Sequence, residues 1–322
     1  MLTAKRTVDA RRDGARSLVQ RTNAGYLVMR QLIACLSLSA ALLAGSGVSA
    51  AEPLLWAGCG ITKKAFMGEL AAAYKRKFGV EIVLEGGGAT KGIRRISDRS
   101  VHIGGTCRPK LPDSDEEAFA ELVPVAWDAL VVIAHPDNPV DEIDLAQLRD
   151  LYDGKITNWK QLGGPDKPVD LLVRKGKISG VGSTLRELVF RDPDHRFVSK
   201  HVFPSSGPLE KAVENNINAI GVTGISSARK REVKLLRLEG KAPNYDTVRS
   251  GEYLLYRPLY IAFNSAEERR AEVKRFIDFA HSRAGREIIR NAGTVPYLEA
   301  LRLVHKQRAQ WKAARTGATT QN

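Results

Sequence analysis

Three short apolar segments near the start of the chain each run directly into a turn that contains glycine. The segments span residues 54–57, 81–84 and 101–104, and the turns span 58–62, 86–92 and 104–107. Helical spacing of apolar residues follows the first turn over 62–78, and a short helix follows the second turn through Ser97. Strands that alternate with helices predict a mainly parallel sheet covered by helices. Ligands bind at the carboxyl ends of the strands in such sheets, so we expect a site at these turns.

The rest of the chain continues the alternation and adds two long apolar segments. We predict strands at 170–173 and 218–222, and helices at 145–152, 185–190, 271–281 and 284–292. Residues 123–134 and 253–262 can cross between two lobes. We therefore expect a two-lobed α/β fold, with 52–133 plus 254–300 in lobe one and 134–253 in lobe two. The cleft between them is the expected ligand site. Residues 301–322 read as a basic C-terminal tail with at most an amphipathic helix.

Residues 1–50 have the pattern of a secretory signal. Met29, a candidate translation start, and Arg30 precede an apolar stretch at 32–43, and small residues follow up to Ala50. A membrane span needs about 20 apolar residues, so we expect a cleaved signal near Ala50 instead. Cys35 lies before most of the apolar run, which argues against a lipid anchor. We expect the mature protein in the periplasm, where disulfides persist.

The chain is basic, with a formal net charge of +14. Residues 1–50 hold seven Lys or Arg and two Asp or Glu, so the remainder carries about +9. Such a charge favours an anionic ligand or surface, although it serves solubility equally well. No basic motif with interleaved aromatic residues is present, so we expect no nucleic-acid partner.

The glycine turns have the composition of an anion site. A helix N-terminus offers unpaired N–H groups and about half a positive charge. A fourth turn, 179–184, precedes a predicted helix and follows Arg174, whose guanidinium can hold an oxyanion. Each turn alone is more often only a helix cap, so the prediction depends on their joint placement. The candidate ligand-binding residues are Gly60, Ile61, Thr62, Ala89, Thr90, Thr106, Cys107, Arg174, Gly182, Ser183 and Thr184.

No motif indicates catalysis. The chain has no Gly-x-Ser-x-Gly elbow, no His-Glu-x-x-His and no phosphate-binding loop that ends in Gly-Lys-Ser/Thr. We expect a binding protein and not an enzyme, with no catalytic residue, no cofactor and no metal site.

The string Gly-Lys-Ile-Thr-Asn-Trp at 154–159 is distinctive, as are the strings at 86–93, 102–109, 218–221, 257–260 and 292–296. Together they resemble the substrate-binding proteins of phosphate ABC importers, which have the type II periplasmic-binding-protein fold. The resemblance covers nearly all of residues 52–300. It implies a monomer that closes on a small oxyanion, phosphate first, and presents it to a membrane permease.

The resemblance also singles out the third turn. Phosphate receptors carry there an aspartate that accepts a proton from the bound phosphate, and Cys107 falls at that place. Ala89 likewise stands where a serine is usual. A neutral thiol gives no filter against a fully ionised anion such as sulfate, so we expect anion binding with weaker selection for phosphate.

Cys59 and Cys107 follow two predicted strands and have three interpretations. Adjacent strands lie about 4.8 Å apart, which suits the Cα separation of a disulfide, about 4.4–6.8 Å, so a disulfide is the first expectation. Buried free thiols that pack as small apolar groups are the second. A redox or soft-metal site is the third, and it would need more ligands. The pair leaves open a non-transport sensing, redox or scaffolding protein on the same fold.

Overall fold

Strand β4 (Ala120–Ala134) belongs to both halves of a mixed sheet. The computed structural model describes residues 52–316 of the 322-residue chain, so the predicted signal segment, Met29 and Cys35 lie outside the described residues. The first part of β4 pairs with β11 (Tyr256–Asn264), and its last part pairs with β8 (Ala219–Gly224), both antiparallel. One continuous strand therefore connects the two halves.

In the first half of the sheet the order is β2-β1-β3-β11-β4. β1 pairs in parallel with β2 and β3, whereas β11 runs antiparallel to β3 and β4. Gly58 lies level with Gly86 and Gly105, so the three parallel strands end at one edge of the sheet. The bounds are Leu54–Gly58 for β1, Ile82–Gly86 for β2 and Ile103–Thr106 for β3, and β12 (Val295–Pro296) adds to β4.

In the second half the order is β4-β8-β6-β7. β6 pairs in parallel with β7 and β8, and Arg174 at the end of β6 lies level with Phe203 of β7. The bounds are Asp170–Arg174 for β6 and His201–Phe203 for β7. β9 (Lys234–Leu235) adds to β4, while β5 (Glu142–Ile143) and β10 (Arg237–Leu238) form a separate pair.

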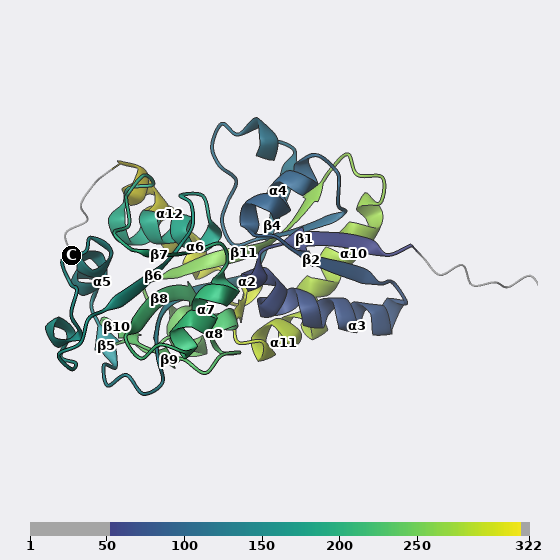
Figure 1. Ribbon diagram of the computed structural model, residues 1–322. Helices are drawn as coiled ribbons and strands as arrows, with labels where there is room; N and C mark the ends of the chain where they lie inside the picture. Colours follow the sequence, from purple (N-terminus) through teal and green to yellow (C-terminus); the bar gives the residue numbers. More distant parts are fainter. Residues whose placement is uncertain (1–51, 317–322) are drawn as a thin grey trace, which may run out of the picture. The chain divides into compact units, whose positions relative to one another are not determined.

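Helices cover both faces of the first half. Figure 1 shows α4 on one side of the strands and α3 on the other. α3 continues a helix that begins with α2 and passes through a π-helical turn, η1. The bounds are α2 Gly60–Thr62, η1 Lys63–Met67, α3 Gly68–Phe78, α4 Ala89–Ser97, η2 Asp115–Glu117, α10 Arg270–His281, α11 Arg283–Asn291 and η5 Tyr297–Glu299.

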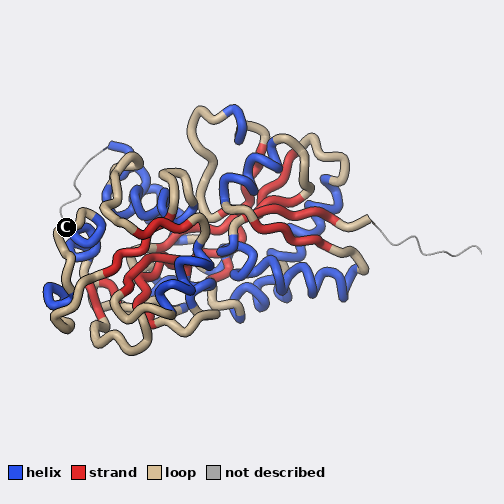
Figure 2. The backbone as a smooth tube through the Cα atoms, in the orientation of Figure 1, coloured by secondary structure: helices blue, strands red, loops and turns tan. Residues whose placement is uncertain are grey.

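The second half is covered in the same way, with helices outside and strands inside (Figure 2). α7 and α8 lie on one side of β6 and β8, and α6 and α12 lie on the other (Figure 1). None of the described helices is long and apolar enough to cross a bilayer. The bounds are α5 Leu145–Tyr152, η3 Trp159–Leu162, α6 Gly180–Leu185, η4 Arg186–Phe190, α7 Ser206–Glu214, α8 Ile225–Ala228, α9 Tyr245–Ser250 and α12 Arg302–Thr316.

The string at 154–159 stabilises the structure through a helix cap and a buried tryptophan. Asn158 caps η3, and its side chain accepts a hydrogen bond from the Lys160 backbone N–H. Trp159 is fully buried, and its indole N–H donates to the carbonyl of Asn218 at 3.0 Å. A buried indole needs such a partner for its polar end. The string thus fixes one end of the second half.

The predicted α/β fold class is confirmed, and every antiparallel pairing of the large sheet involves β4 or β11. The predicted helix at 145–152 matches α5. The first helix begins at Gly60, two residues before the predicted start, because Cys59 caps it. β7 and α7 were not predicted. The described residues belong to one compact unit, and the division into two lobes stays a prediction.

Candidate functional site

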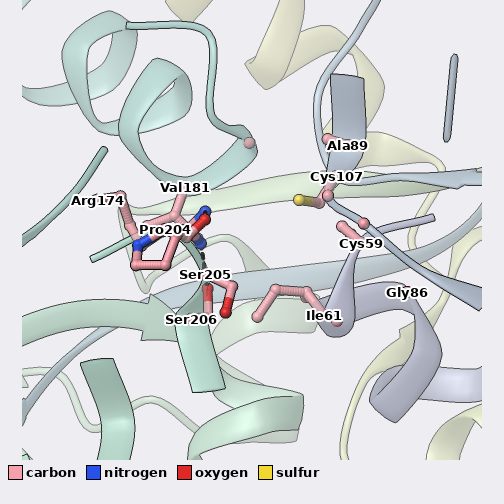
Figure 3. A pocket seen from close by; sticks show the side chains of 14 residues that line it. Cys59, Ile61, Gly86, Ala89, Cys107, Arg174, Val181, Pro204, Ser205 and Ser206 are labelled. Atoms are coloured by element: carbon pink, nitrogen blue, oxygen red, sulfur yellow. Dashed lines mark hydrogen bonds between the residues drawn. The ribbon is translucent and has the colours of Figure 1, made fainter. Parts of the chain in front are cut away.

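A cavity of about 340 Å³ lies where the strand ends of the two halves meet. This volume is at the lower end of the range for small-molecule sites. Figure 3 shows Arg174, Val181, Ser205 and Ser206 on one side of it, and Ala89, Cys59 and Cys107 on the other. The lining residues are Cys59, Gly60, Ile61, Gly86, Gly87, Gly88, Ala89, Cys107, Arg174, Gly180, Val181, Pro204, Ser205 and Ser206.

The turn after β1 places the start of a long helix at the cavity. Cys59 is the N-cap, and its sulfur accepts a hydrogen bond from the Thr62 backbone N–H at 3.4 Å. Gly60 and Ile61, the first two helical residues, line the cavity. The first N–H groups of a helix have no partner within it. They are therefore available to a ligand.

The turn after β2 places a second helix start beside the first. Gly88 is the N-cap of α4 with φ at 96°, a conformation that favours glycine. Its N–H donates to the Gly58 carbonyl at 3.2 Å, which ties this turn to the end of β1. Ala89, the first residue of α4, lines the cavity.

The second half supplies two more helix starts. α6 begins at Gly180, and α7 begins at Ser206 with Ser205 as its N-cap; all three residues line the cavity. Four helix N-termini thus meet at one cavity, two from each half of the sheet. Each carries the equivalent of about half a positive charge, so the cavity favours an anion.

Arg174 adds a full charge to this wall. Its guanidinium donates to the Ser206 hydroxyl at 2.7 Å and to the Pro204 carbonyl at 2.9 Å (Figure 3). Both acceptors are neutral, and no carboxylate of the described chain forms an ion pair with Arg174. Arg174 therefore presents its charge at the cavity without a direct carboxylate partner among the described residues.

Cys59 and Cys107 are both buried free thiols, so the disulfide that we expected first is not formed in this structure. The Cys59 sulfur instead caps its own helix and lies 3.3 Å from the Thr62 hydroxyl. A hydrogen bond from Cys59, with Arg257 and Arg174 nearby, lowers the pKa of Cys107. Burial raises the pKa of Cys59. The pKa values of the two thiols are thus shifted in opposite directions.

A buried ion pair lies behind the cavity. Arg257 is 1% exposed and donates to Asp128 at 3.2 Å and to the Gly180 carbonyl at 2.8 Å. Asp128 is fully buried, and burial raises its pKa against the opposing effect of Arg257. Arg257 lies on β11 in the first half and Gly180 on α6 in the second. The arginine thus connects the two halves directly behind the site.

Five of the predicted ligand-binding residues line the cavity, namely Gly60, Ile61, Ala89, Cys107 and Arg174. The other six do not line it, and their four threonine hydroxyls donate to backbone carbonyls of the protein. Thr62 donates to the Cys59 carbonyl, Thr90 to Ile178, Thr106 to Arg108 and Thr184 to Gly180. Gly182 and Ser183 lie within α6, beyond the two helix-start residues that reach the cavity.

Ser205 and Ser206 are the main lining residues that the sequence analysis missed. Ser-Ser-Gly-Pro at 205–208 precedes apolar residues at Leu209 and Val213, which is the pattern of a helix start with a serine cap. That signal could have identified α7 and its N-terminus.

Comparison with known proteins places the chain in a family. The profile of the PBP superfamily domain matches residues 57–284. The Phosphate-binding protein PstS of Borreliella burgdorferi is 25% identical over 251 residues, which cover 75% of this chain and 89% of that protein. The PstS protein of Bacillus subtilis is 27% identical over 256 residues, covering 78% and 79%.

Two solved structures of phosphate-transport proteins are also similar to this chain. A putative phosphate ABC transporter substrate-binding protein from Clostridium perfringens, with bound phosphate, has a TM-score of 0.70 and 28% identity, and covers 76% of this chain and 99% of that one. An ABC-type phosphate transport receptor from Vibrio cholerae has a TM-score of 0.59 and 27% identity, covering 75% and 99%. The chain therefore belongs to the PBP superfamily, and phosphate-binding proteins are among its relatives there.

Proposed function

We propose that this protein is a receptor that binds a small oxyanion, phosphate first, in the cavity between the two halves of the sheet. The observation that carries the proposal is the meeting of four helix N-termini around Arg174, whose guanidinium has only neutral hydrogen-bond acceptors. Main-chain N–H groups, hydroxyls and a guanidinium all donate hydrogen bonds, which suits a ligand whose oxygens accept them. The names of the relatives support the same ligand.

The relatives also suggest the physiological role. One similar structure is described as a putative phosphate ABC transporter substrate-binding protein, and on that basis we infer delivery of the anion to a membrane permease of an ABC importer. We further propose that the protein is exported by the signal at residues 1–50 and acts in the periplasm as a monomer without enzymatic activity. Binding is then non-covalent, and release depends on reopening of the cavity.

Thermal unfolding with and without anions tests the proposal. A ligand at about 100 times its Kd stabilises the folded state by about 2.7 kcal/mol. We expect millimolar phosphate to raise the Tm of the purified protein, and chloride at matched ionic strength to leave it unchanged. The Arg174→Gln variant should lose most of the phosphate shift. Absence of any shift with phosphate, sulfate, molybdate and tungstate would exclude an oxyanion receptor.

A further inference from the structure

Cys107 occupies an unusual place among the groups that line the cavity. Among the described residues, no aspartate or glutamate lines it, and the helix starts and Arg174 present hydrogen-bond donors. Hydrogen phosphate carries one O–H group that needs an acceptor, whereas sulfate carries none. Figure 3 shows the Cys107 sulfur directed toward the side of the cavity that holds Arg174 and Val181. A sulfur in this position can meet one oxygen of a bound tetrahedral anion.

Four groups on other elements act on the charge of Cys107. Cys59 before α2 donates a hydrogen bond to it, Arg257 on β11 and Arg174 on β6 favour its ionised form, and Asp128 on β4 opposes it. Asp128 is engaged by Arg257 and by the Ser226 hydroxyl, and Arg174 has only neutral acceptors. Two cations and one carboxylate leave an excess of positive charge at the sulfur. Nearby arginines stabilise a thiolate over a thiol.

The hydrogen bonds of Arg257 support this distribution of charge. Two of its nitrogens donate to Gly180 and Asp128, but the buried Nε–H has no hydrogen-bond partner. A buried donor without an acceptor is costly, and a negative charge nearby reduces that cost. An ionised Cys107 supplies such a charge from within the protein. The neutral thiol assumed in the sequence analysis does not.

We propose that Cys107 is the proton acceptor of the site, an ionised sulfur that accepts the O–H of hydrogen phosphate and repels a fully ionised anion such as sulfate. The hydrogen bond forms without proton transfer, so the bound anion keeps its proton and the sulfur its charge. This inference depends on the proposed function, because it names the form of the anion that the receptor selects. The ionised sulfur would then take the place of the aspartate carboxylate expected at this turn from the resemblance. Selection for the protonated anion would be kept, although the chemical group differs.

Calorimetric titration of phosphate and of sulfate into the purified protein at about pH 8 tests the selection. We expect wild type to bind phosphate at least about tenfold more tightly than sulfate, where tenfold corresponds to 1.4 kcal/mol. Cys107→Ala should lower that ratio at least about tenfold, chiefly because sulfate gains affinity once the like charge is removed. Cys107→Asp restores an ionised acceptor and should keep the preference. Equal affinities in wild type, or a preference that survives in Cys107→Ala, would overturn the proposal.

A measurement without ligand separates this inference from the proposed function. The ultraviolet absorbance of the thiolate, followed against pH in the ligand-free protein, should show a group that ionises below the ordinary cysteine range and is absent from Cys107→Ala. If that group is present but phosphate does not bind, the proposed function fails and the ionised Cys107 stands without its selective role. If phosphate binds but the low-range group is missing, the receptor stands and the inference fails.

Discussion

Cys107 and Gly180 face each other so closely that a Cβ atom on Gly180 would overlap the Cys107 sulfur. Cys107 follows β3 in the first half of the sheet, and Gly180 begins α6 in the second. The contact therefore exists only while the two halves are together. It makes position 180 a sensitive probe of that arrangement.

Gly180→Ala should destabilise this arrangement by about 1–3 kcal/mol, the usual cost of an overpacked contact. Urea unfolding measures the loss, and calorimetry should show weaker anion binding. In the double variant with Cys107→Ala the clash is removed, so stability should largely return. Gly60→Ala is the matched control, because a Cβ there meets nothing within 4 Å and the change should be close to neutral for stability. A destabilisation that persists in the double variant would contradict the contact.

Arg174→Gln should weaken phosphate binding by about 10- to 100-fold. The reason is that a hydrogen bond from a charged group contributes about 1.5–3 kcal/mol, and 1.4 kcal/mol is a factor of ten. Isothermal calorimetry at constant ionic strength gives the two Kd values. Arg237→Gln, which removes an exposed arginine paired with Glu142, is the control for net charge and should leave the Kd within about twofold. Equal losses in both variants would assign the effect to the net charge of the molecule.

Asp128→Asn should lower the free energy of unfolding by about 3–5 kcal/mol, because it leaves the buried Arg257 without its charged partner. Denaturant unfolding measures the change. Glu252→Gln breaks an exposed ion pair with Lys241 and should cost less than about 1 kcal/mol. Similar effects of the two substitutions would show that the buried Asp128–Arg257 pair contributes no more to the free energy of unfolding than an exposed ion pair.

The stability that Cys107 contributes should depend on pH. Its pKa is lowered from 9.0 to about 6, chiefly by the hydrogen bond from Cys59. A lowered pKa adds stability that is complete above the unfolded value and is lost as the pH falls through the folded value. The difference in unfolding free energy between wild type and Cys107→Ala should therefore grow by at least about 1 kcal/mol from about pH 6 to about pH 8.5. A difference that is flat with pH would contradict the lowered pKa.

Both cysteines should react with an alkylating agent when the protein is unfolded without a reductant. Mass spectrometry of the peptides that contain Cys59 and Cys107 then shows two modified thiols, as expected from their free state in the structure. A single cross-linked peptide pair would show that the disulfide forms in the purified protein.

The glycine turns were predictable from sequence because their signals are local. An apolar segment followed by glycine and a helical pattern identifies a strand end and a helix start within a few residues, and three of the four helix starts at the cavity lie in such turns. The fourth, at Ser206, has an equally local signal that was not used. Arg174 was predictable for the same reason, since it ends a recognisable strand.

The direction of individual side chains could not be predicted in the same way. Residues in a helix are rotated by about 100° from one to the next, so an error of two residues in the helix start moves a side chain to another face. Thr184 was predicted to precede a helix that begins at residue 185, but it lies within α6 and its hydroxyl donates to the Gly180 carbonyl four residues earlier. Short hydroxyl side chains readily bond to nearby backbone in this way. The lowered pKa of Cys107 was likewise beyond the sequence, because Cys59, Arg257 and Arg174, which lower it, are brought together only by the fold.

The helix starts around the cavity affect how sequence changes at the site alter anion binding. Their donors are main-chain N–H groups, which every residue except proline possesses. Substitutions at the rim can therefore accumulate without removing the attraction for negative charge, because that attraction resides in the backbone. Discrimination among anions then depends on a few side chains, with Cys107 and Arg174 foremost. A substitution of Cys107 should therefore change which oxyanion the cavity prefers more than it changes the attraction of the cavity for anions as a class.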